Sequence, residues 1–222
     1  MKFKDITTLT FSTTAGRQLI LCGACTLLLS CISSPSLQTA HTLAPGQGQS
    51  YIGFNMYTSP SINKAVNKDT RFDQGDVRDY SILFGHKRGL DDNIDAGVRV
   101  SLFGSAGFDV KYRFLHTASV NLATGFDLNY ASISTGDGDA KADINVIDYT
   151  LPLWTSYDFS PETSIYAVPR YIMRKVTGDA SGTLFLFGWT FGLKSTSATP
   201  VAFEVSQIQG HITQFSVAYF FF

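Results

Sequence analysis

The sequence predicts an all-β fold: a single closed, antiparallel up-and-down transmembrane β-barrel of about ten strands. Three observations support this prediction. Apolar and polar residues alternate along most of the chain after residue 49, each alternating stretch is about as long as a tilted membrane-spanning strand, and compact turns alternate with long polar segments. Charged residues make up only 16% of the chain, against about 25% in an average soluble protein. We therefore expect much of the surface to face something other than water.

The alternation is clearest in residues 94–102 and 108–114, where every even-numbered residue is apolar and the odd-numbered ones include Asp95, Arg99, Asp109 and Lys111. Successive residues of a strand point to opposite faces, so each stretch has one apolar and one polar face. A soluble lipocalin-like barrel or sandwich would alternate as well, with stretches such as "TLFLFGWTFGLK" turning their aromatic residues inward. Parity alone does not distinguish the two arrangements.

Breaks in the alternation delimit the expected strands. They predict strands at residues 49–58, 78–88, 93–103, 107–115, 118–132, 143–158, 163–175, 182–194, 199–208 and 211–222. Merging or losing a hairpin would give eight or twelve. Pro152 and Pro169 fall within the sixth and seventh strands, where neither can donate to a ladder, so we expect a bulge or local gap there.

The connections differ between the two ends of the expected barrel. Long polar segments follow the first and fifth strands, whereas "GLDD", "HT", "SPE" and "STSAT" form compact turns at the other end. The run "GLDDNIDAGVRVSLFGSAGFDVKYRFL" (89–115) resembles the repeated hairpin of small bacterial outer-membrane β-barrels, and the ending "FSVAYFFF" resembles their C-terminal signal. This resemblance covers nearly all of the mature chain as a pattern of residue types.

The resemblance implies a bacterial outer-membrane location, with the compact turns and both termini in the periplasm. It implies outer-membrane lipids and the barrel-insertion machinery as partners, and it indicates no oligomeric state. The residues that carry the C-terminal membrane signal are Phe215, Val217, Tyr219 and Phe221 on the expected lipid face, with Phe222 as an additional residue.

The N-terminus resembles a bacterial lipoprotein signal. Basic residues precede the apolar stretch "LILCGACTLLLS", and Leu28, Leu29 and Ser30 lead into Cys31 as in a lipobox. The resemblance implies a signal peptide at 1–30 and lipidation of Cys31, followed by a flexible periplasmic tether at 31–48 and the barrel at 49–222. Cys25 and ordinary cleavage after Ala40 are the alternatives. If Cys31 is the anchor, the mature chain has no cysteine pair for a disulfide or a metal site.

The inward parity of the expected barrel carries charges of both signs. This lumen network consists of Lys87, Asp95, Arg99, Asp109, Lys111, Arg113, Asp127, Asp148, Arg170, Arg174 and Glu204. Small barrels usually fill their interiors with side chains. Opposite charges that face one another would plug the lumen, whereas one-sided strips would line a narrow channel.

The composition and motifs limit the function. The chain has 17 Lys and Arg against 18 Asp and Glu, a net charge of -1, which argues against nucleic acid as a partner. No metal-ligand spacing or phosphate-binding loop indicates a metal or cofactor. We expect no catalysis, and a non-catalytic envelope-structural role or narrow small-solute passage. An enzyme acting on lipid or peptide at the barrel rim, through His211, Ser206 and Glu204, is the alternative.

Overall fold

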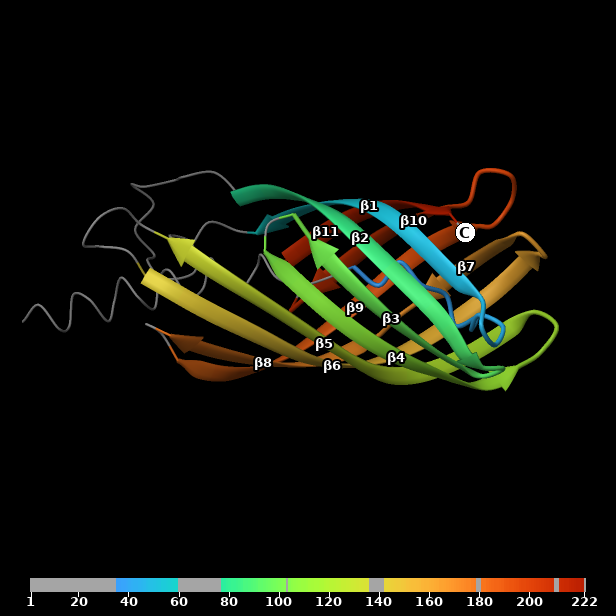
Figure 1. Ribbon diagram of the computed structural model, residues 1–222, viewed down its shortest axis with the longest axis horizontal. Helices are drawn as coiled ribbons and strands as arrows, with labels where there is room; N and C mark the ends of the chain where they lie inside the picture. Colours follow the sequence, from blue (N-terminus) through green and yellow to red (C-terminus); the bar gives the residue numbers. More distant parts are fainter. Residues whose placement is uncertain are drawn as a thin grey trace, which may run out of the picture.

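The computed structural model describes residues 35–59, 77–102, 104–135, 142–178, 181–209 and 212–221. These residues form one antiparallel sheet of eleven strands, shown in Figure 1. The strands are β1 Gly48–Ser59, β2 Val77–Asp91, β3 Ile94–Ser101, β4 Ser105–His116, β5 Val120–Thr135, β6 Ala142–Ser160, β7 Thr163–Ala167, β8 Arg170–Gly178, β9 Gly182–Ser195, β10 Val201–Ile208 and β11 Ile212–Phe221. In the described part of the chain, no helix is long and apolar enough to cross a membrane.

The sheet closes on itself as a barrel. β1 pairs with both β2 and β11, and β9 pairs with β10, so the chain of neighbours has no free edge. β7 and β8 share one position, because both pair with β6 and with β9 in a continuous register. Eleven strands with two in one position give ten positions, so the prediction of a closed ten-stranded antiparallel barrel is confirmed.

The break between β7 and β8 coincides with Pro169, where the sequence predicts a bulge or gap. The ladder nevertheless continues across it, because Leu153 N donates to Pro169 O at 3.0 Å and Val168 exchanges two hydrogen bonds with Thr190. Only the hydrogen bond that a proline nitrogen cannot donate is missing at this position. Pro152 keeps a partner for its carbonyl, which accepts a hydrogen bond from the Thr124 hydroxyl. The interruption therefore leaves the wall closed.

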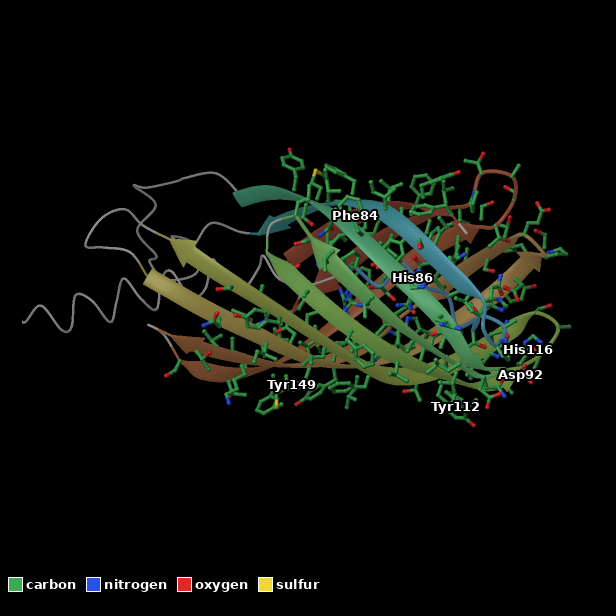
Figure 2. The ribbon with its side chains drawn as sticks, in the orientation of Figure 1. Phe84, His86, Asp92, Tyr112, His116 and Tyr149 are labelled. Atoms are coloured by element: carbon green, nitrogen blue, oxygen red, sulfur yellow. The ribbon has the colours of Figure 1, made fainter. Side chains whose placement is uncertain are left out.

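The outer surface is apolar. Large side chains of the predicted outward parity are exposed around the barrel, and Figure 2 shows Phe84, Tyr112 and Tyr149 at its outer surface. Phe185 and Phe187 are 59% and 56% exposed, while Asp109 and Lys111 are each 2% exposed. The inverted, lipocalin-like arrangement requires the opposite, so this alternative is wrong for the described strands.

Residues 35–47, which precede β1 (blue in Figure 1), form what we call the inner segment: residues 35–43 are buried or partly buried inside the barrel, and residues 44–47 are exposed. The sequence predicts a flexible periplasmic tether at 31–48, yet the described part of that range bonds to side chains that point into the lumen. The backbone of Leu37 and Thr39 and the side chain of Gln38 supply these hydrogen bonds. The segment leaves the lumen at the end of the barrel that carries the compact turns, here called the turn end, and then begins β1.

Candidate functional site

The lumen contains a network of paired charges centred on Asp109 of β4. Its carboxylate accepts from Lys87 Nζ at 2.9 Å and from Arg99 Nη1 at 3.0 Å, and Gln38 Nε2 of the inner segment lies 3.3 Å away. β2, β3 and β4 are neighbours, and the inward parity of each brings one charged side chain to the same level. All three charged groups are at least 90% buried, so each depends on the others for its charge compensation.

Other pairs extend this pattern around the lumen. Arg99 also contacts Asp127 and Asn129, Lys111 Nζ lies 3.2 Å from Asp95, and Arg174 makes a bidentate contact with Asp148 at 2.6 and 2.7 Å. The structure therefore brings opposite charges face to face, the arrangement that favours a plugged lumen.

Arg113 lies apart from the other charges. It donates to Asp92 O at 2.9 Å and to Asn93 at the turn end, where Figure 2 labels Asp92. Its role is to fasten the β2–β3 turn to β4 and not to join the network within the lumen. Arg113 keeps the inward parity that the sequence predicts, opposite Ala123, but its position at the turn end brings it to the β2–β3 turn.

Glu204 of β10 anchors the start of the inner segment. Its two carboxylate oxygens accept from the backbone N–H groups of Ser36 and Leu37 at 2.8 and 2.5 Å, and Tyr166 OH donates at 3.1 Å. Trp154 Nε1 donates to Ser36 Oγ at 2.8 Å. Leu37 has a φ of 48°, an uncommon conformation for leucine that places both N–H groups on one carboxylate. Glu204 thus lies deep in the lumen, away from any rim.

The rest of the inner segment is held at several levels down to the turn end. Lys111 Nζ donates to Thr39 O at 3.2 Å and to His41 O, and His41 Nε2 lies 2.8 Å from Asp158 Oδ1. Thr42 Oγ1 donates to Asp92 O at 2.8 Å. The segment therefore bonds to β4, β6 and the β2–β3 turn as well as to β10.

Gly89 permits the segment to turn back into β1. Gly46 N donates to Gly89 O and Gly89 N to Gln47 O, each at 2.9 Å. A Cβ at Gly89 would lie 2.1 Å from Ala44 O, a distance that no side chain tolerates. Glycine at this position is thus a condition for the observed path of the segment.

Two tyrosines in the lumen lie flat over glycines of neighbouring strands. A Cβ at Gly85 would lie 2.2 Å from the Tyr51 ring, and one at Gly192 would lie 2.1 Å from the Tyr166 ring. The absent side chains leave the space that the rings occupy. In Tyr166 this placement also directs the hydroxyl towards Glu204.

The remaining predicted residues are placed as follows. Phe215, Tyr219 and Phe221 are exposed on the outer face, with Val217 partly exposed, as expected for a lipid-facing set. Cys31, Phe222 and His211 lie outside the described residues. Ser206 donates to Glu204 at 3.2 Å, but both are buried in the lumen and not at the rim. No group of metal-ligating side chains is found among the described residues.

Sequence reasoning missed several lumen residues. Trp154, Tyr166 and Lys194 are absent from the predicted network, although they share the inward parity of their strands. That parity was the signal that could have identified them. Nothing in the sequence marked Gln38 or Thr39, because the inner segment has no periodic pattern.

These features define the class of structure. The described chain is a closed ten-stranded β-barrel with an apolar exterior and a lumen that contains paired charges and residues 36–42 of the same chain.

Comparisons with known proteins find similarity in structure only. No protein-family model and no curated protein matches the chain. Three similar solved structures are the attachment invasion locus protein Ail of Yersinia pestis (12% identity, 80% of this chain and 99% of that chain, TM-score 0.36), the N-terminal β-barrel domain of Pseudomonas aeruginosa OprF (12%, 79% and 100%, 0.37) and the COG4313 outer membrane channel of Pseudomonas putida F1 (11%, 85% and 98%, 0.42). The assignment of the fold rests on the strand pairing described above.

Proposed function

We propose that this chain is a bacterial outer-membrane β-barrel with a non-catalytic, envelope-structural role, closed to solutes by its own inner segment and charge network. The observation that carries the proposal is that paired charges and the inner segment occupy the lumen. Charges of opposite sign pair across it, and Ser36 to Thr42 occupy the space between the walls. An aqueous passage would need neither.

The exposed aromatic and aliphatic side chains support the membrane location. Their removal from water requires an apolar solvent, and a closed barrel satisfies its backbone within itself, as a bilayer demands. On this proposal the turn end faces the periplasm, because outer-membrane barrels have short turns on that side. The start of β1 and the C-terminal end of β11, which pair with each other at the turn end, would then lie on the periplasmic side. Fractionation of cells should place the chain in the outer membrane, with heat-modifiable migration on gels, whereas a fully soluble periplasmic pool would contradict the proposal.

Lipidation of Cys31 is part of the proposal and rests on the lipobox resemblance alone. Metabolic labelling with a fatty acid should mark the wild-type chain and fail to mark Cys31→Ser. Equal labelling of Cys31→Ser would indicate that another residue, such as Cys25, is lipidated. An unlabelled wild type would refute the lipid anchor.

Planar-bilayer recording tests whether the lumen is closed. The full chain should insert without a steady ohmic conductance. A steady conductance that changes on charge reversal at Arg99 or Lys111 would contradict the proposal and favour the alternative, a narrow small-solute passage lined by the same charges.

The non-catalytic part of the proposal rests on how the polar groups are connected. At the turn end Asp158 accepts from both Ser164 and His41, so the serine hydroxyl is bonded to the carboxylate and has no basic partner there. A nucleophilic serine needs the histidine between itself and the acid. His211→Ala should leave lipid and peptide profiles unchanged, and any altered profile would favour the rim enzyme.

A further inference from the structure

A cavity of about 670 Å³ lies at the turn end of the lumen, between the inner segment and the barrel wall. Its lining includes Lys87, Lys111 and Lys194 from β2, β4 and β9, together with Gln49 and Phe220. The volume falls in the range of about 300–1,000 Å³ typical of small-molecule sites. Whether this cavity binds a ligand is a separate question from whether the barrel conducts.

The lysines of this cavity differ in their partners. Lys87 pairs with Asp109 at 2.9 Å, and Lys111 pairs with Asp95 at 3.2 Å. Lys194, in contrast, has no carboxylate within ion-pair distance among the residues that the structure describes. Its Nζ lies 3.2 Å from Gln49 Oε1 and 4.1 Å from the centre of the Phe220 ring.

The carboxylates that line the cavity are bonded to other groups, so none of them compensates the charge of Lys194. Lys87 and Lys111 line the same cavity, and the carboxylate of Asp95 beside them is already bonded to Lys111. The other acidic group of the lining, Asp158, is occupied by His41, Ser164 and Asn121. An ammonium group has three N–H donors, and Gln49 accounts for one of them.

From this geometry we infer that the turn-end cavity binds a small anion with phosphate or carboxylate groups, held principally by Lys194. Gln49 would orient the ammonium, Lys111 would contribute a second positive charge, and Phe220 would provide an apolar wall beside the charged end. The carbonyl oxygens of Thr39 and His41 already accept from Lys111, so the inner segment forms part of the site. On the proposed orientation the ligand would come from the periplasm.

Isothermal titration calorimetry on the full chain in a nonionic detergent tests the inference, with sodium phosphate and citrate as probes at constant ionic strength. We expect saturable binding of at least one probe to the wild type and a loss of about tenfold or more in Lys194→Met, because a charge-assisted contact is removed. Lys194→Arg should retain binding. The matched control is Lys175→Met, since Lys175 is exposed on the outer face of β8 near the opposite end.

The outcomes separate the inference from a purely structural role for Lys194. Heat-modifiable migration establishes that each variant is folded, and if Lys194→Met fails to fold, Gln49→Leu provides the second test with a several-fold weaker affinity expected. Absence of saturable binding in the wild type, or equal affinity in the wild type and the folded variants, overturns the inference. Because conductance is not the readout, an open lumen would refute the proposed function and leave this result standing.

Discussion

Replacing Asp109 by asparagine should destabilise the barrel more than any exposed charge removal. Asp109 pairs with Lys87 Nζ at 2.9 Å and Arg99 Nη1 at 3.0 Å, and its side chain is 2% exposed. Arg99 keeps Asp127 in the variant, but Lys87 loses its one carboxylate partner within the described residues. The substitution therefore leaves a buried ammonium group without compensation.

The size of the effect follows from this loss. Breaking a buried ion pair by removing one partner typically costs about 3–5 kcal/mol. For a chain of this length 1 kcal/mol corresponds to about 2–4 °C in Tm, so the unfolding midpoint should fall by about 6–20 °C. Lys87→Met combined with Asp109→Asn removes both charges, and the double variant should lie closer to the wild type than Asp109→Asn alone.

Gel migration of unboiled samples after heating measures the midpoint in a fixed detergent. Glu162→Gln is the control, because Glu162 is exposed in the turn between β6 and β7 and its change should fall within about 0.5 kcal/mol. If Asp109→Asn matched that control, or if the effects of Asp109→Asn and Lys87→Met simply added, the pairing would not hold the lumen together and the reasoning would be refuted.

Three further predictions concern the outer face and the close contacts in the lumen. Phe191 is 57% exposed on the outer face, so Phe191→Arg should cost up to about 2–4 kcal/mol near the bilayer centre and reduce the heat-modifiable yield, unlike Phe191→Leu. Gly89→Ala would place Cβ 2.1 Å from Ala44 O and should displace the inner segment, seen as new conductance in planar bilayers; Gly182→Ala, with nothing within 4 Å, should have no such effect. Gly192→Ala should lower the unfolding midpoint through its contact with the Tyr166 ring, by about 1–3 kcal/mol, and an additional Tyr166→Ala should relieve the clash; additive losses would contradict this account.

Most of the fold could be predicted from alternation. A period of two assigns each strand residue to a face, and the polarity of residues such as Asp109 and Phe187 then indicates which face is inside. Closure into ten positions followed from the number and length of the stretches. The prolines were also informative, since Pro169 interrupts the seventh strand where its missing N–H predicts.

The pairing of the lumen charges could be predicted only in part. Parity places Arg99, Asp109 and Lys87 inside, but which carboxylate meets which cation depends on the register between strands. The register determines which side chains lie at the same height in the lumen. Gly97 of β3 pairs with Lys87 of β2 and with Asp109 of β4, and because glycine has no side chain the two charged groups meet across it. Single-strand periodicity contains no such cross-strand information.

The inner segment is the part that periodicity could least predict, because its backbone follows no repeating pattern. Its hydrogen bonds depend on lumen residues that are distant in the sequence, such as Glu204, which is 167 residues from Leu37. A polar stretch of Ser, Gln and Thr has the same composition whether water or a polar lumen satisfies it. Composition alone therefore indicates a tether equally well.

The two sides of the lumen nevertheless contain a clue. β2, β3 and β4 contribute long charged side chains, whereas the inward positions of β1, β10 and β11 include a cluster of small residues, Gly53, Ala202 and Ala218. Leu37 packs with both alanines, and its Cδ1 lies 3.4 Å from where a Cβ of Gly53 would be. Since a protein interior is close-packed, a barrel wall lined with small residues requires material from elsewhere in the chain to fill the space beside it. A lumen with small residues on one side, together with a polar N-terminal stretch, is therefore a sequence pattern that predicts an internal segment.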